Sequence, residues 1–239
     1  MVWSIATLGI FYDIDNIEEK LNGFQYSRLE KILEKEKSLI SAIQLSPRRY
    51  ELSDDVHILS GMVIDEYIVR NSHIIKKDEN GKWIIKKDKP FVDTRWTEFW
   101  ITTKSIILVE RKNARGFAFR VISKALTMSE EYIHPVIMDI ERIANDHPGH
   151  WLGSITDRRG NMQNATMFGT NLEGDTVIGD EYIRCHKAQV GFITDFFEAP
   201  VKIKVTRDGT IVIMKNLTND IGAFIQYIRQ NLLQYATPI

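Results

Sequence analysis

Three charged residues near the middle of the chain have types and spacing that could support metal-dependent chemistry. Asp93 stands in one predicted strand, and a second, apolar strand from Ile106 to Arg111 carries Glu110 and leads to Lys112. Side chains two positions apart in a strand point to the same face, so Glu110 and Lys112 can share one site. Because carboxylate oxygens are the ligands that Mg²⁺ prefers, this pattern is consistent with a cation held beside a lysine.

The order of these elements resembles the PD-(D/E)xK nuclease core over residues 90–126. The resemblance implies a Mg²⁺-dependent nuclease in which Asp93 and Glu110 hold the metal and Lys112 orients or stabilises the attacking water. Glu98 is the alternative to Asp93, because it lies nearer to the predicted hairpin. An exposed strand end also produces a Glu-x-Lys triplet without any catalytic role. Two interpretations therefore stand: a metal site, or a solvated strand end.

The segment from Lys76 to Lys89 is the strongest local basic patch. Asn80-Gly81 predicts a two-residue hairpin turn within it, because such a turn needs residues that adopt positive φ. Lysines bind nucleic-acid phosphates through their charge, whereas a charge-rich hairpin is also typical of a solvated surface. A turn near 158–160 and an alternating strand over 201–206 add further cations. The candidate nucleic-acid-binding residues are Lys76, Lys77, Lys82, Lys86, Lys87, Arg158, Arg159, Lys202 and Lys204.

The charge balance argues against a strongly basic nucleic-acid binder. The 239 residues carry a formal net charge of −1. Residues 1–128 hold 21 Lys and Arg against 18 Asp and Glu, a net +3, whereas residues 129–239 hold 10 against 14, a net −4. Any binding of nucleic acid must therefore come from a local patch.

Location and cofactors are constrained mainly by what the sequence lacks. The single cysteine, Cys185, excludes an intramolecular disulfide, and we expect a cytoplasmic protein. No run reaches the roughly 20 apolar residues of a membrane helix, so no membrane partner is expected. The sequence contains neither GxGxxG nor a Walker motif, and we expect no cofactor except Mg²⁺ in the nuclease alternative. His147-x-x-His150 with Cys185-His186 offers zinc-ligand types, although the first pair also fits a loop that ends a helix.

A unit of strand, tight turn, strand and helix occurs twice in the chain. The first copy covers residues 99–126, and the second covers 201–234. Elsewhere the periodicity predicts a first strand over 3–14, a short helix through 21 and a meander over 56–111. It also predicts a helix after Ser27 that extends through Ile43, a helix that begins at Pro135 and a strand over 182–185.

These elements predict an α+β protein of two similar lobes, each an antiparallel sheet covered by helices, with boundaries at 1–127 and 128–239. The order resembles the tandem TATA-binding-protein-like fold over residues 95–126 and 199–235. In that family the concave sheet meets the DNA minor groove through apolar wedges. By position, Phe99, Trp100, Phe196 and Phe197 would be the aromatic residues to test, although aromatic residues in strands usually belong to a core or an interface.

The leading hypothesis is a non-enzymatic module that binds DNA, RNA or a protein partner through a sheet surface or the lysine hairpin. The alternatives are the Mg²⁺-dependent nuclease and a structural protein that forms homo-oligomers. Against the nuclease, the second copy of the repeated unit has Met214-Lys215-Asn216 where the first has its acidic site. The two copies share hydrophobic period but differ in their charges, so we expect function where they differ.

Overall fold

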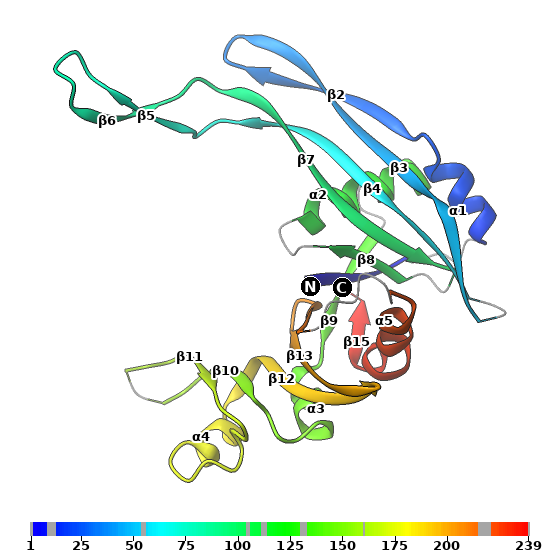
Figure 1. Ribbon diagram of the computed structural model, residues 1–239, viewed down its shortest axis with the longest axis vertical. Helices are drawn as coiled ribbons and strands as arrows, with labels where there is room; N and C mark the ends of the chain where they lie inside the picture. Colours follow the sequence, from blue (N-terminus) through cyan, green and yellow to red (C-terminus); the bar gives the residue numbers. More distant parts are fainter. Residues whose placement is uncertain are drawn as a thin grey trace.

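The computed structural model describes residues 2–8, 13–53, 56–103, 106–110, 114–129, 133–159, 161–214 and 221–238, and strands predominate (Figure 1). The strands are β1 (Val2–Leu8), β2 (Gln25–Ile32), β3 (Lys35–Ser53), β4 (Val56–Val69), β5 (His73–Lys77), β6 (Trp83–Lys87), β7 (Phe91–Thr102), β8 (Ile106–Glu110), β9 (Ile133–Met138), β10 (Leu152–Thr156), β11 (Ala165–Phe168), β12 (His186–Phe197), β13 (Ala199–Thr206), β14 (Thr210–Ile213) and β15 (Ala236–Pro238).

The helices are short and lie on the faces of the sheet. They are α1 (Ile14–Leu21), α2 (Arg115–Thr127), α3 (Ile140–Asp146), α4 (Gly179–Arg184) and α5 (Ile221–Tyr227). α5 continues through a π-helical turn, Ile228–Leu232, and a 3₁₀ turn, Leu233–Tyr235. Among the described residues, no helix is long and apolar enough to cross a membrane.

Within the described part of the chain, thirteen strands form one antiparallel sheet. Its order is β11-β10-β12-β13-β14-β1-β8-β7-β4-β3-β2, and β9 pairs with both β1 and β15. Trp3 of β1 lies opposite Ile211 of β14 on one side and Glu110 of β8 on the other. The N-terminal strand therefore joins the strands of the two repeated units into a single sheet.

The predicted architecture of two similar helix-covered lobes is wrong, because this one sheet runs through the protein. Both repeated units exist, as β7–β8–α2 and β13–β14–α5. Their helices, however, pack in different cores: Val121 of α2 lies in one cluster of buried side chains and Phe224 of α5 in the other. The order strand, strand, helix does not determine which face the helix covers, and here the two copies cover opposite faces.

The central strands supply both cores by alternation of side chains. In β8, Ile106 and Leu108 belong to the core that includes α3 and α5, whereas Ile107 and Val109 belong to the core that includes α1 and α2. A strand that is buried on both faces is hydrophobic along its whole length rather than at every second position. This explains the continuous apolar run of β8.

The helix predicted after Ser27 is instead the β2–β3 hairpin, which turns at Leu33 with a φ of 58°. The apolar residues have helical spacing, but Leu29, Leu33 and Ile40 are exposed while Leu39 is buried, so they form no single buried stripe. β3 pairs with β4 over most of its length. This long-range pairing outweighs the local helical preference.

Two further predictions are wrong at residues whose local preference is ambiguous. Pro135 lies in β9 opposite Ala6, and α3 begins only at Ile140, where the Asp139 carboxylate accepts a hydrogen bond from the backbone N–H of Arg142 at 3.1 Å. Residues 182–185, predicted as a strand, largely belong to α4. By contrast, α2, β7, β8 and the β13–β14 hairpin confirm the predicted elements.

β5 and β6 form a separate two-stranded sheet that extends away from the body between β4 and β7 (Figure 1). We call residues 73–87 the arm. Gly81 has the positive φ, 77°, that the sequence predicts for the turn. The loop nevertheless runs from Asp78 to Lys82, where the backbone N–H of Asp78 donates to the carbonyl of Lys82 at 2.9 Å. Because β4 and β7 pair up to Val69 and Phe91, the arm is the outer part of one long hairpin.

Gly61 marks the closest approach between β4 and its neighbours. A Cβ atom at this position would lie 2.6 Å from the carbonyl oxygen of Gln44 and 2.9 Å from the ring of Phe99. We expect Gly61→Ala to lower the free energy of unfolding by about 1–3 kcal/mol, the usual cost of overpacking. Urea denaturation followed by circular dichroism measures the change.

Gly116→Ala provides the matched control, because a Cβ atom there meets nothing within 4 Å. Alanine in this α2 position should stabilise the helix by about 0.5–1 kcal/mol. Equal unfolding free energies for the two variants would contradict the close packing at Gly61.

Candidate nucleic-acid interface

The arm presents lysine and apolar side chains together on both of its faces. Residues opposite each other in an antiparallel pair share a face. The pairs are His73 with Lys87, Ile74 with Lys86, Ile75 with Ile85, Lys76 with Ile84 and Lys77 with Trp83. Neither face is therefore purely polar, as a merely solvated hairpin would be.

The large apolar side chains of the arm are open to solvent. Trp83 is 66% exposed, Ile75 69% and Ile85 73%. Lys77 Nζ lies 5.1 Å from the centre of the Trp83 ring, within the range of a cation–π contact. Large exposed apolar patches are typical of surfaces that meet another molecule, so the arm is a candidate interaction surface.

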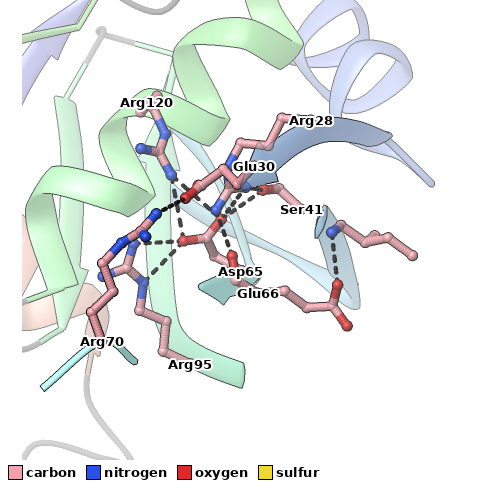
Figure 2. A network of polar contacts seen from close by, with 9 residues as sticks. Arg28, Glu30, Ser41, Asp65, Glu66, Arg70, Arg95 and Arg120 are labelled. Atoms are coloured by element: carbon pink, nitrogen blue, oxygen red, sulfur yellow. Dashed lines mark hydrogen bonds and ion pairs between the residues drawn. The ribbon is translucent and has the colours of Figure 1, made fainter. Parts of the chain in front are cut away.

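A buried carboxylate lies on the same ribbon, eight positions before the arm begins. The Asp65 side chain is fully buried and accepts hydrogen bonds from Ser41 Oγ at 2.6 Å and Arg28 Nη1 at 2.9 Å. Arg95 binds it with Nε at 2.9 Å and Nη2 at 2.6 Å, and Arg120 Nη2 lies 3.4 Å from both carboxylate oxygens. Figure 2 shows these guanidinium groups converging on Asp65 from three sides.

The arginines determine the ionisation state of Asp65. Burial opposes ionisation, but the hydrogen bonds from Ser41 and Arg95 and the charges of Arg28 and Arg95 outweigh it and lower the pKa of Asp65 below its ordinary value. Asp65 is therefore an anion that ties β2, β3, β7 and α2 to β4. We call Asp65 and the arginines around it, Arg28, Arg70, Arg95 and Arg120, the arginine cluster.

Sequence reasoning missed this cluster, although one signal for it exists. Asp65 follows the buried Val63 at the spacing of inward-facing residues, and Arg95 precedes the buried Thr97 and Phe99 at the same spacing. A charged residue that continues a buried alternation needs a partner of opposite charge. The partners Arg28 and Arg120, however, come from distant elements that only the fold brings near.

The remaining predicted basic residues lie away from the arm, Arg158 and Arg159 after β10 and Lys202 and Lys204 in β13. Arg158 forms an ion pair with Glu181 at 2.9 Å, and Arg159 lines a small cavity beside α4. Lys202 and Lys204 alternate with buried residues in β13, and Lys202 Nζ lies 5.2 Å from the centre of the Trp151 ring. Since β13 and β4 are separated by β14, β1, β8 and β7, Lys202 and Lys204 lie in a different part of the sheet from the β4–β7 ribbon that carries the arm.

The structure brings two of the predicted nuclease residues together and separates a third. The β7–β8 register places Glu98 beside Glu110 on one face. Asp93 lies five positions from Glu98, about 17 Å along the strand and on the other face, where its carboxylate accepts a hydrogen bond from Tyr67 Oη at 3.2 Å. Lys112 lies outside the described residues.

The candidate zinc ligand His150 and the candidate aromatic wedge residues make contacts inside the protein. His150 is buried, and its Nδ1 lies 2.9 Å from Glu173 Oε1 and 3.0 Å from Tyr182 Oη. Among the described residues, no group of three or more His, Cys, Asp or Glu side chains could hold a metal ion. Phe99 and Phe197 are buried, and Trp100 and Phe196 pack against a core.

Comparison with known protein families and with curated proteins finds no match to this sequence. The fold and site define a protein with one large antiparallel sheet, a cationic apolar arm and, at the base of that arm, a buried carboxylate surrounded by partly exposed arginines.

Removal of the Asp65 charge should strongly destabilise the fold. Asp65→Asn leaves three arginines around a neutral, buried amide, and we expect the free energy of unfolding at pH 7 to fall by about 3–5 kcal/mol. The solvent-exposed Asp180→Asn is the control. Chemical denaturation of the two variants measures the difference, and similar losses would show that the cluster contributes little.

The same carboxylate predicts a dependence of stability on pH. Because the folded-state pKa of Asp65 is lowered, its ionisation stabilises the protein above the unfolded value of about 3.9. This contribution is lost as the pH falls through the lower folded-state pKa. Asp65→Asn should therefore show a weaker loss of stability than the wild type between about pH 5 and pH 2.

Proposed function

We propose that the protein is a non-enzymatic nucleic-acid-binding module whose arm contacts the nucleic acid. The observation that carries the proposal is the projecting ribbon, whose two faces both combine lysines with exposed apolar side chains. A two-stranded β-ribbon has the width that the major groove of DNA accepts. The predicted lysines of the arm, Lys76, Lys77, Lys82, Lys86 and Lys87, are then the phosphate-binding residues.

Electrostatics supports the arm rather than the protein as a whole. Residues 73–89 carry six lysines against three carboxylates, a local net charge of +3 in a chain of net charge −1. Lysines that replace the counterions of phosphates account for most non-specific affinity for nucleic acid. A projecting arm also keeps these charges away from the acidic C-terminal half.

The apolar side chains favour a partner with flat, stackable surfaces. Trp83 lies beside the loop of the arm and is exposed, so its ring is accessible to an unpaired base. Stacking of a base on an aromatic ring contributes about 1–3 kcal/mol and does not depend on sequence. The pair Ile75 and Ile85 provides an apolar surface beside the indole ring.

Loss of arm lysines should weaken binding in a salt-dependent way. We expect a variant with Lys82, Lys86 and Lys87 changed to Ala to reduce the slope of log affinity against log salt by about 2–3, roughly 0.9 for each lost phosphate contact. Fluorescence anisotropy with labelled single-stranded and duplex oligonucleotides provides the test. The salt concentration is varied from about 50 to about 200 mM, where the release of counterions strongly affects affinity.

The β2–β3 hairpin offers a matched control of equal charge change. Lys31, Lys35 and Lys37 are exposed there, and their change to Ala should leave the slope unchanged. If the wild type does not bind at low salt, nucleic acid is not the partner. Concentration-dependent dimerisation that the arm variant loses would instead assign the arm to a second copy of the chain.

A nuclease is the second candidate, and the neighbouring carboxylates of Glu98 and Glu110 favour it. Two adjacent carboxylates can hold a divalent cation that activates water. Under this candidate, plasmid cleavage requires Mg²⁺ and falls by about 100-fold or more in Glu110→Gln, because the variant loses a metal ligand. The exposed Glu34→Gln is the control, and cleavage that persists in Glu110→Gln would rule the candidate out.

A further inference from the structure

The arginines of the cluster differ in how completely their donors are used, and Arg28 uses four of its five N–H groups. Its Nε donates to Glu30 at 3.2 Å, and its Nη1 donates to Ser41 at 2.7 Å and to Asp65 at 2.9 Å. Its Nη2 donates to the backbone carbonyl of Glu66 at 2.5 Å. Arg28 therefore has a purely structural set of contacts.

Arg120 has the opposite character. Within the described residues, its hydrogen bonds are the two long ones from Nη2 to Asp65, at 3.4 Å, and the Asp65 carboxylate already accepts shorter bonds from three other side chains. Arg120 Nε is shielded from water and has no acceptor among the described residues. A buried cationic donor of this kind is rare unless an ion, a water or a ligand accepts from it.

Arg95 is held in place but keeps one free end. Its Nε and Nη2 bind Asp65, while its Cζ atom lies 4.8 Å from the centre of the Tyr67 ring and 4.4 Å from the centre of the Phe117 ring. The two rings fix the orientation of the group, and no hydrogen bond from Nη1 exists within the described structure. A guanidinium that is already oriented loses little entropy when it binds an anion.

The balance of charge leaves room for one more anion. Four arginines of the cluster face the carboxylates of Asp65 and Glu30, whereas the Glu66 carboxylate points away from them and accepts a hydrogen bond from the backbone N–H of Ile40 at 2.8 Å (Figure 2). Arg70, with a side chain 56% exposed, reaches Glu30 only at 3.7 Å. Cationic donors are thus in excess at the outer side of the cluster.

We propose that Arg120 and Arg95, with Arg70 at the rim, bind a phosphate group. A phosphate offers several acceptor oxygens, and the planar guanidinium binds it through paired hydrogen bonds. The phosphate can belong to a nucleic-acid backbone or to a small molecule. A backbone phosphate as ligand rests on the proposed function of the arm. It is compatible with the fold because β4 and β7 run directly from the cluster into the arm.

Thermal unfolding in phosphate tests the site without nucleic acid. We compare midpoints in sodium phosphate and in sodium chloride at equal pH and ionic strength. For the wild type we expect a midpoint about 2–4 °C higher in phosphate, the shift expected for a chain of this size when ligand exceeds its Kd several-fold. Arg120→Met, which keeps an apolar stem, should abolish this shift.

Two further variants keep the result interpretable. Arg142→Met removes the same charge from α3, outside the cluster, and should retain the shift. Arg120→Lys keeps the charge but not the planar fork and should lose most of the shift while folding normally. An equal midpoint in phosphate and chloride for the wild type, or an undiminished shift in Arg120→Met, would overturn the proposal.

Duplex and single-stranded DNA then identify the source of the phosphate. If it is a backbone phosphate, Arg120→Met should lower the slope of log affinity against log salt by about 0.7–0.9, while the arm lysines keep their own contribution. A phosphate shift without any DNA binding would support the site with a small phosphate compound as ligand and would refute the proposed function alone.

Discussion

The pairing of β1 on both sides is the constraint on which the sheet depends. Without it, β8 and β14 would each present an open edge of backbone donors and acceptors, and the two repeated units would be separate sheets. β1 satisfies both edges at once, with Ser4 opposite Val109 and Thr210. The β13–β14 turn is held to the same place, since the backbone N–H of Ile5 donates to the carbonyl of Gly209 at 3.1 Å. A fold-level repeat thus becomes one continuous surface.

The outer ribbon depends on a different interaction. Beyond the reach of α2, β4 and β7 lose the apolar cover that buries Val63 and Phe99. Asp65 lies at that boundary and connects β4 to the strands on either side and to α2 through charge-assisted hydrogen bonds. Paired and hydrogen-bonded burial of charge is specific in geometry, so these contacts hold β4 in place against β2, β3, β7 and α2. The arm and the arginine cluster therefore lie on the same β4–β7 hairpin.

The two candidate sites differ in how far local sequence could reveal them. The lysines of the arm lie within a short stretch of sequence, and the hairpin register alone places them together. The sequence therefore reveals their density. The arginine cluster joins positions 28, 65, 70, 95 and 120, and no local pattern relates them. The nuclease residues fall between these cases. Glu98 is the predicted alternative to Asp93 because it lies nearer to the hairpin, and the β7–β8 register places it beside Glu110. A metal-binding role remains a prediction.

By itself, the sequence determined the elements whose signals are short in range: the β7 and β8 strands, the α2 helix, the positive φ at Gly81, and the cationic character of the arm. Tertiary structure alone decided that the apolar residues after Ser27 belong to a hairpin, that α2 and α5 cover opposite faces, and that Arg120 lies beside Asp65. The physical reason is the same in each case. Backbone pairing and burial of charge depend on groups far apart in the chain, and their energies exceed the local preferences that a sequence pattern displays.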